Sequence, residues 1–320
     1  MERFRTPFVA LPGEEHAGRF NGAGWSAVLR QADDDAGRVS IVGGRAVDLY
    51  AGSWAAAQRA VDLINGSRVL MNGDPDLWAF YPIAYNEAEP AWMEPAARTA
   101  LGEEQLLSQS GIPTACAIAA RASRRRRWAH AVARYKFSLG LFSVHHMDMH
   151  PNYRTYHGVS RHPDDHVLLA QTLVAAFAVV EDLGLAVPAG PGRPSRLGGV
   201  WNPVVLRDLE QRLAAQHVDP ADTVLWLVRG PSRRIERRRP LPNGTPASWT
   251  GGSVRDRRLP VVDAIAHADY LRDRVAAHGA RDVTRSLTPY DVVNVQALAR
   301  FLLLTSLGFR VWETGVGAGR

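Results

Sequence analysis

An arginine and a histidine near the end of one predicted helix are the residues of this sequence with the clearest potential for chemistry. Arg272 and Asp273 are followed by His278 and then by a glycine, which is a plausible helix stop. Apolar residues recur at three- and four-residue steps through 261–275, and this spacing indicates a helix. At about 100° per residue, Arg272 and His278 fall on its apolar side, where an unpaired charge is costly. The alternative is that both lie at the frayed end of a surface helix.

Arg272-Asp273 followed by His278-Gly279 resembles the signature of the HEPN superfamily, an arginine and a polar residue with a histidine a few positions further on. This resemblance implies a metal-independent endoribonuclease without a cofactor, often a toxin or antiviral-defence effector. It also implies RNA as substrate, a homodimer and room for a regulatory partner. Arg272 would hold the scissile phosphate and stabilise the developing negative charge. His278 would exchange protons with the ribose 2′-hydroxyl, which is the nucleophile, or with the leaving oxygen, and Asp273 would help to position the pair.

The spacing of this motif brings in a second arginine. Five residues separate Arg272 from His278, which is at the loose end of the range for the motif. Arg274 lies four residues before His278, so these two would be direct neighbours on one helix face. Arg274 is therefore an alternative to Arg272 as the phosphate-binding arginine.

A strongly apolar predicted helix at 163–184 offers a partner for Arg272. Proline and two acids begin this helix, and apolar residues cover nearly its whole surface, so we expect it to be central in the fold. Glu181 follows on the stripe of Val174 and Phe177, where a carboxylate needs a partner such as an arginine. The helix resembles the acid-bearing helix of HEPN bundles. We therefore expect Glu181 to orient Arg272, and the alternative is an exposed glutamate in the last helical turn.

The order of the predicted elements extends the resemblance over about Pro113–Gly308. The expected helices lie at 114–141, 163–184, 203–216, 261–278 and 288–308, with a strand or buried turn at 223–228. A motif helix followed by a long leucine-rich closing helix matches the order in HEPN bundles. The sequence thus predicts a mainly α chain, with a HEPN-like helical domain at 112–320 behind a small N-terminal α+β module at 1–111.

The N-terminal module carries a shorter, mixed pattern. Strand-like runs lie at 25–29 and 38–42, a helix is expected at 53–64 with a stop at Asn65-Gly66, and another strand at 68–71. The module contains no phosphate loop, nucleophile elbow or paired-carboxylate signature. Its aromatic residues are of a type that stacks on bases, although core and interface positions are their commoner use. The sequence of the module does not indicate its role.

Two arginine-rich segments are candidates for contact with RNA. Arg124–Arg127 point around the whole of the predicted helix 114–141, so not all four can be buried. The segment 229–258 is a long basic loop, and loops of this length inside a domain are usually functional or disordered. Its candidate RNA-binding residues are Arg233, Arg234, Arg237, Arg238 and Arg239. The alternatives are a solvated helix face and a solvated insertion.

A histidine-rich segment suggests two alternatives to the nuclease. It holds six of the eleven histidines, namely His145, His146, His150, His157, His162 and His166. Imidazole and carboxylate are ligands for zinc, iron or manganese, so a metal-dependent hydrolase using the His145–His166 cluster is one alternative function. No HExxH or other fixed ligand spacing is present, however, and a polar connecting loop explains the segment without a metal. The other alternative is a non-catalytic helical module that binds RNA or protein, with Arg272 and Glu181 as a structural ion pair.

The composition is that of a chain with a packed core and an excess of positive charge. Apolar residues make up 46% of the 320 residues, and the longest apolar runs are far shorter than a membrane span. Cys116 is the only cysteine, which excludes an intrachain disulfide and a cysteine metal cluster. A net charge of +6 permits an anionic partner. However, Lys136 is the only lysine, and such a preference for arginine is also typical of a coding bias, so the charge alone does not indicate a partner. We expect a cytoplasmic protein.

Overall fold

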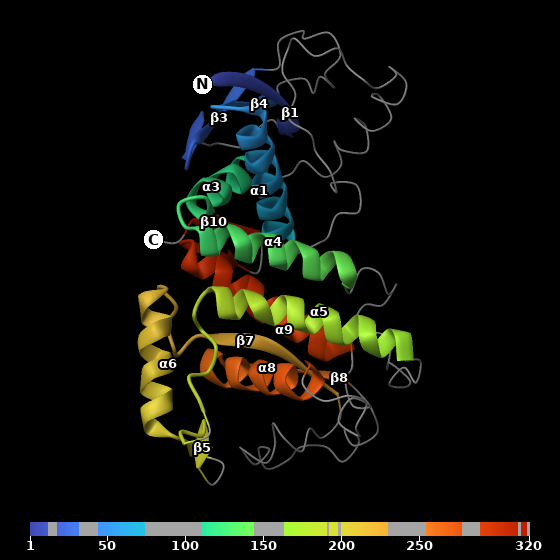
Figure 1. Ribbon diagram of the computed structural model, residues 1–320, viewed down its shortest axis with the longest axis vertical. Helices are drawn as coiled ribbons and strands as arrows, with labels where there is room; N and C mark the ends of the chain where they lie inside the picture. Colours follow the sequence, from blue (N-terminus) through green and yellow to red (C-terminus); the bar gives the residue numbers. More distant parts are fainter. Residues whose placement is uncertain are drawn as a thin grey trace. The chain divides into compact units, whose positions relative to one another are not determined.

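Figure 1 shows a computed structural model of the chain. The structure describes residues 1–11, 18–31, 44–73, 111–143, 163–190, 192–197, 200–229, 254–276, 289–312 and 315–318. Contacts divide the chain into two compact units, Met1–Lys136 with Val311–Ala318, and Phe137–Arg310 with Gly319–Arg320. The two units are described separately.

The first unit is built on a four-stranded antiparallel sheet in the order β1-β4-β3-β2. Its strands are β1 (Glu2–Ala10), β2 (Arg19–Gly22), β3 (Trp25–Gln31) and β4 (Arg45–Ala51). Side chains alternate between the two faces of a strand, so residues opposite each other in the register share a face. Phe4 lies opposite Leu49, which lies opposite Ala27, and all three are fully buried in the core. The predicted strand at 25–29 is confirmed as part of β3, whereas 38–42 lies outside the described residues.

Helices α1 (Trp54–Asn72) and α3 (Ile112–Ala122) contribute to the same hydrophobic core as this face of the sheet. The side chain of Ser53 accepts a hydrogen bond from the Ala56 backbone N–H and caps the start of α1. The helix ends at Gly73, whose φ of 71° lies in the left-handed region that glycine adopts without strain. Thus α1 has a defined residue at each end.

Helix α1 corrects two sequence predictions. The stop expected at Asn65-Gly66 and the strand expected at 68–71 are both wrong, because α1 continues to Asn72. Residues Asn65–Leu70 are buried, so tertiary packing outweighs the low helix propensity of asparagine and glycine. Gly66 faces α4 (Arg126–Leu141), and a Cβ atom at this position would lie 2.8 Å from Val132 Cγ1. Here glycine permits a close helix contact, where the sequence suggested a break.

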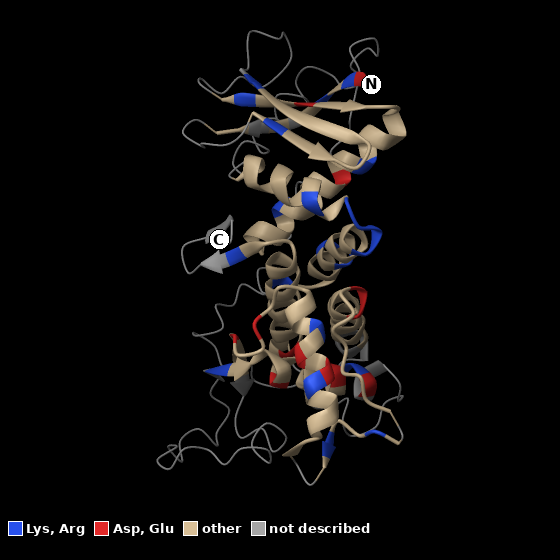
Figure 2. Ribbon diagram, turned by 90° about the vertical axis from the view of Figure 1, so that its left-hand side faces the viewer, with Lys and Arg blue, Asp and Glu red and all other residues tan. Residues whose placement is uncertain are grey.

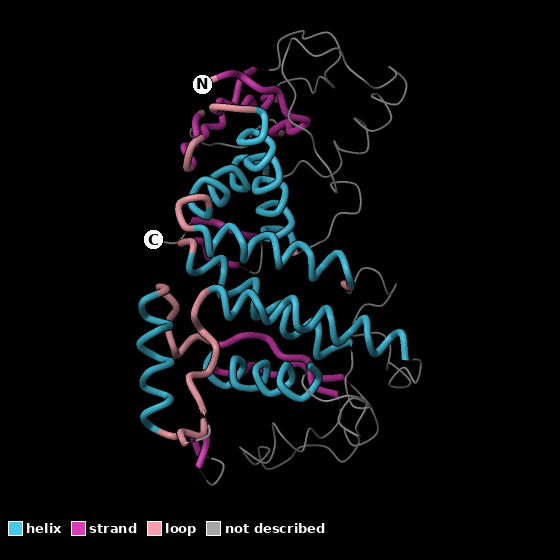
Figure 3. The backbone as a smooth tube through the Cα atoms, viewed as in Figure 1, coloured by secondary structure: helices cyan, strands magenta, loops and turns pink. Residues whose placement is uncertain are grey.

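The second unit is mainly helical (Figure 3). Its helices include α5 (Pro163–Asp182), α6 (Pro203–Ala215), α8 (Val261–Ala276) and α9 (Pro289–Ser306). Helix α5 packs against both α8 and α9, and α8 also contacts α9. Phe177 on α5, Ile265 on α8 and Leu302 on α9 are all fully buried. The two helices therefore cover much of the apolar surface of α5, whereas Val167 and Leu168 near its start are exposed.

Strands β7 (Thr223–Arg229) and β8 (Val254–Pro260) form an antiparallel pair that packs on α8 and α9. The prediction of a basic loop over 229–258 is therefore wrong from Val254 onward, because these residues belong to β8. The strand forms because β7, far away in sequence, supplies its hydrogen-bonding partner, and local composition does not reveal that pairing. Residues 230–253 lie outside the described part of the chain.

Asn294 on α9 holds β7 with both ends of its side-chain amide. Its Oδ1 accepts a hydrogen bond from the Leu227 N–H at 2.7 Å, and its Nδ2 donates to the Leu227 carbonyl at 2.8 Å. Only 2% of Asn294 is exposed, and both of these hydrogen bonds are partly buried. Together they satisfy the backbone polar groups of Leu227 that β8 does not occupy.

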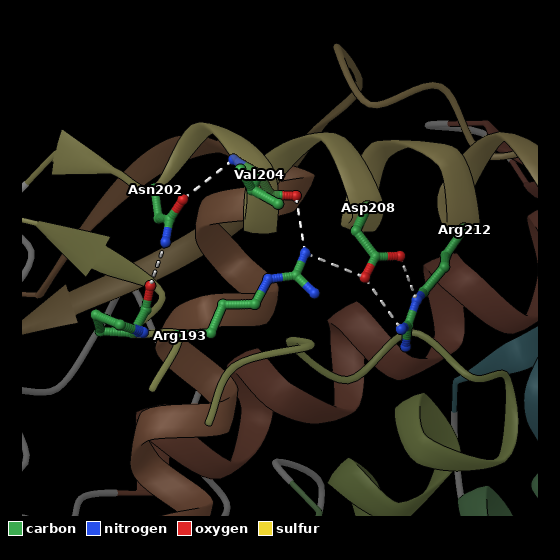
Figure 4. Close-up of polar contacts among 6 residues, drawn as sticks. Arg193, Asn202, Val204, Asp208 and Arg212 are labelled. Carbon is green, nitrogen blue, oxygen red and sulfur yellow. Dashed lines mark hydrogen bonds and ion pairs between the residues drawn. The ribbon is translucent and has the colours of Figure 1, made fainter. Parts of the chain in front are cut away.

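Side-chain hydrogen bonds also hold the segment between α5 and α6, to which Arg193 belongs (Figure 4). Asn202 caps the helix, because its Oδ1 accepts a hydrogen bond from the Val204 N–H at 3.1 Å. Arg193 donates from Nη2 to the Val204 carbonyl at 3.0 Å and lies 3.5 Å from Asp208 Oδ2. Asp208 in turn pairs with Arg212 one helical turn later. The segment between α5 and α6 is thus attached to α6 through the side chain of Arg193.

The described residues form a mixed α+β structure with seven helices and an N-terminal antiparallel sheet. Two further strands, β9 (Phe309–Trp312) and β10 (Gly315–Ala318), make a separate two-stranded sheet. The division into units places α3 and the first part of α4 with the sheet, whereas the sequence suggested a boundary after residue 111. Among the described helices, none has both the length and the apolar character needed to cross a bilayer.

Candidate active site around Arg272

Arg272 lies near the end of α8 and reaches across to α5. Its Nη2 donates a hydrogen bond to Glu181 Oε1 at 2.9 Å, between residues 91 positions apart. The contact expected from the stripe on α5 is therefore present in the structure. The Arg272 Cζ atom also lies 5.2 Å from the centroid of the Phe177 ring, a geometry in which cation and aromatic face attract each other. Helix α5 thus supplies both the carboxylate and the aromatic surface that fix this guanidinium.

Two carboxylates on α8 itself complete the surroundings of Arg272. Asp273 Oδ1 lies 2.9 Å from Nη1, and Asp269 Oδ1 lies 3.7 Å from Nη2. The Nε atom is buried and has no hydrogen-bond partner within the described residues. Both terminal nitrogens of Arg272 are therefore engaged, and the group has one fixed orientation.

The ionisation of Asp269 is altered by its surroundings in this cluster. Burial raises the pKa of Asp269 from its ordinary 3.8 to about 6. The carboxylates of Asp273 and Glu181 also raise this pKa, while the Arg272 guanidinium lowers it. A carboxyl group with a pKa in this range exchanges a proton near neutral pH, which is the property required of a general acid or base.

The cluster is open to solvent on one side. The side chains of Arg272 and Glu181 are 33% and 44% exposed, and that of Asp269 is 22% exposed. One guanidinium therefore faces three carboxylates at a surface that a ligand can reach. A phosphate approaching Arg272 would meet this negative charge, unless a carboxylate is protonated or moves aside. The arrangement is well suited to fixing the end of α8, and it restricts direct contact between Arg272 and an anion.

The start of α8 is fixed by a second cluster. Asp263, in the first turn, accepts hydrogen bonds on Oδ1 from Arg196 Nη2 at 2.6 Å and from Trp201 Nε1 at 2.8 Å. The Arg196 Cζ atom lies 4.6 Å from the centroid of the Trp201 ring. These partners belong to β5 (Arg196–Leu197) and β6 (Val200–Trp201), so α8 is held by side chains at both of its ends.

Several candidate residues lie where the structure gives no side-chain position. His278 lies outside the described residues, and Arg274 belongs to α8 without a described side chain. The arginines at 233, 234, 237, 238 and 239 also lie outside the described residues. The same holds for the histidines from His145 to His162, and the side chain of His166 at the start of α5 is not described. Within the described side chains, no group of three or more His, Cys, Asp or Glu residues is arranged to hold a metal.

Two participants in the Arg272 cluster were missed in the sequence. Asp269 lies three residues before Arg272, a spacing at which helical side chains are neighbours, so the pattern contained this signal. Phe177 lies one turn before Glu181 on α5, so it faces the same partner once the two helices pack. The raised pKa of Asp269 had no sequence signal, because it depends on burial against another helix.

Comparison of the chain with protein-family models, curated proteins and solved structures gives no match. In the described part of the chain, the Arg272 cluster is the arrangement that joins a motif residue to a residue of another helix.

Proposed function

We propose that this chain is a metal-independent endoribonuclease of the HEPN type, which cuts RNA with an arginine of α8 and with His278. The observation that carries the proposal is the contact between Arg272 and Glu181, because it joins the motif helix to the acid-bearing helix. The packing of α5 against α8 and α9 adds support, since a HEPN-like bundle requires these three helices to be neighbours.

The proposed reaction is an attack of the RNA on its own backbone. The ribose 2′-oxygen bonds to phosphorus, the bond from phosphorus to the 5′-oxygen breaks, and a cyclic phosphate remains on the upstream fragment. His278 accepts the proton of the 2′-hydroxyl or donates one to the leaving 5′-oxygen, and an arginine stabilises the charge that develops on the phosphate. DNA is not cut because it lacks the 2′-hydroxyl.

Single variants identify which arginine touches the phosphate. Arg272 already contacts Glu181 and Asp273 through its terminal nitrogens, which favours a positioning role for it. In that case Arg274→Ala abolishes cleavage, while Arg272→Lys, which keeps a cation beside Glu181, retains part of the activity. The opposite pattern, with activity surviving Arg274→Ala and lost in Arg272→Lys, assigns the phosphate contact to Arg272.

Cleavage of structured RNA in EDTA tests the proposal directly. We expect the purified chain to degrade RNA and to leave cyclic phosphate ends, and we expect His278→Ala to lose nearly all of this activity, by about 100-fold or more. A matched control is His217→Asn, because His217 is exposed and its φ of 61° suits asparagine. Arg207→Ala is the corresponding control for the arginine variants, since Arg207 is exposed on α6.

The outcomes separate the proposal from its competitors. Equal RNA loss with the wild-type chain and with His278→Ala would sink the nuclease proposal. Activity that disappears in EDTA and survives His278→Ala would instead favour a metal-dependent hydrolase using the His145–His166 cluster. Elemental analysis of the purified protein gives an independent readout of that alternative.

A non-catalytic helical module is the second candidate function. The observation that favours it is the set of three carboxylates and one aromatic ring around Arg272, which is also what a structural ion pair between helices looks like. Under this interpretation Arg272→Ala lowers thermal stability, and substitutions of His278 do not change how much RNA is degraded. A stable chain that binds RNA or protein without cutting RNA would support this candidate.

A further inference from the structure

The turn between α3 and α4 concentrates positive charge in the first unit. Residues 112–141 contain six arginines and one lysine and no aspartate or glutamate. Arg124–Arg127 occupy the turn and the first residues of α4, and Figure 2 draws this stretch in blue. The Arg272 cluster belongs to the second unit.

The four arginines of this turn are exposed, and none of them has an acidic partner among the described residues. Each of Arg124–Arg127 belongs to the exposed class of side chains. Within the described residues none of them forms an ion pair, and their one side-chain contact is that of Arg125, whose Cζ lies 4.3 Å from the centroid of the Trp128 ring. Their charge is therefore available to an anion from solvent.

The backbone of the turn is held in place while its arginines remain in solvent. The Ser123 hydroxyl donates to the Ala120 carbonyl at 2.8 Å and accepts a hydrogen bond from the Ala23 N–H at 2.9 Å. The second bond attaches the turn to the loop between β2 and β3. The arginines thus project from a fixed base, which lowers the entropy lost when a ligand orders them.

Helix stability does not account for arginines at this position. The start of a helix carries the positive end of its dipole, where acidic residues are favourable and basic residues are not. Arg126 and Arg127 are the first two residues of α4, and none of the residues from 112 to 141 balances them with a negative charge. An external anion would relieve this repulsion.

We propose that Arg124–Arg127 bind the sugar-phosphate backbone of single-stranded RNA, with the stacked Arg125 and Trp128 offering a flat surface to an unpaired base. The charge of the turn calls for a polyanion, and the choice of RNA over other polyanions rests on the proposed function. The surface is a binding site that supplements the nuclease motif and makes no contribution to bond cleavage.

A second group of arginines in the described part of the first unit is a weaker candidate. Arg3 and Arg30 lie on the sheet face opposite the core, but both pair with Asp48, whose side chain is fully buried. The carboxylate of Asp48 therefore neutralises part of their positive charge. The turn at 124–127 has no such carboxylate within the described residues, so it is the better partner for a phosphate chain.

A binding assay with the full chain carrying His278→Ala tests this proposal without cleavage of the probe. The probe is a fluorescent single-stranded RNA of about 20 nucleotides, and the readout is anisotropy over a range of salt concentrations. We expect the triple substitution Arg124→Gln, Arg126→Gln and Arg127→Gln to weaken binding about tenfold or more, and to reduce the log–log salt slope by about 2. Replacement of the same three residues by lysine should restore most of the affinity.

A control of equal charge makes the result specific. Arg45, Arg59 and Arg207 are exposed arginines outside this turn, and their triple substitution by glutamine changes the net charge by the same amount. An equal loss of RNA affinity in both triple variants would overturn the proposal. Tighter binding of acidic phospholipid vesicles or of single-stranded DNA than of RNA would overturn RNA as the occupant. The assay measures binding alone, so specific RNA binding supports this inference even if the chain proves unable to cut RNA.

Discussion

The ionisation of Asp269 makes the free energy of unfolding depend on pH. Its folded pKa of about 6 lies above the ordinary 3.8, so the folded state binds this proton more tightly than the unfolded state. The free energy of unfolding should therefore fall by about 2 kcal/mol between pH 4 and pH 6 through this group. Denaturant unfolding of the wild-type chain and of Asp269→Asn across this range measures the effect. The difference between the two should change with pH, and parallel profiles would contradict the assignment.

Cys116 should be chemically silent in the folded chain. It is fully buried in the core of the first unit, and this burial raises the pKa of its thiol to about 12. Since the thiolate is the reactive form, we expect an aromatic disulfide reagent to label the native chain only slowly at pH 8, and to label it rapidly in denaturant. Rapid labelling under native conditions would show that the core of this unit opens readily.

Gly66 allows two helices of the first unit to approach closely. Gly66→Ala gains about 1 kcal/mol in helix propensity, but the new Cβ would lie 2.8 Å from Val132 Cγ1. Overpacking of this kind costs about 1–3 kcal/mol, so we expect a net loss of stability on the order of 1 kcal/mol in urea unfolding. Val132→Ala should restore stability when it is combined with Gly66→Ala. Gly52→Ala is the control, because a Cβ there meets nothing within 4 Å.

The sequence predicted the helices of the second unit better than the strands of the chain. The helices at 163–184 and 203–216 were expected because apolar periodicity and end residues are local signals, and α5 and α6 confirm them. Strands β1 and β4 were missed, since each is defined by pairing with the other across some 45 residues. Within the Arg272 cluster, Glu181 was expected from its helix stripe, whereas the burial of Asp269 depends on how α8 packs against its neighbours.

At the scale of the whole molecule, the proposed nuclease is expected to be a dimer of the chain. The resemblance to HEPN proteins implies that each copy brings its own motif to a shared cleft. We therefore expect light scattering after gel filtration to give twice the monomer mass of 35.1 kDa. A monomer that still cleaves RNA at nanomolar concentration would contradict a shared cleft while leaving the chemistry of His278 intact.

The amide of Asn294 makes one backbone position a reporter of how the second unit assembles. The Leu227 N–H donates to a buried side chain of α9, so we expect its exchange with deuterium to speed up when α9 moves away from β7. Its exchange rate under native conditions therefore measures the free energy of undocking that helix. In pulse-labelling hydrogen exchange during refolding, the time at which the Leu227 amide becomes protected would show when α9 docks on β7. Asn294→Ala should abolish this protection, while the neighbouring amides still report on the pairing of β7 with β8.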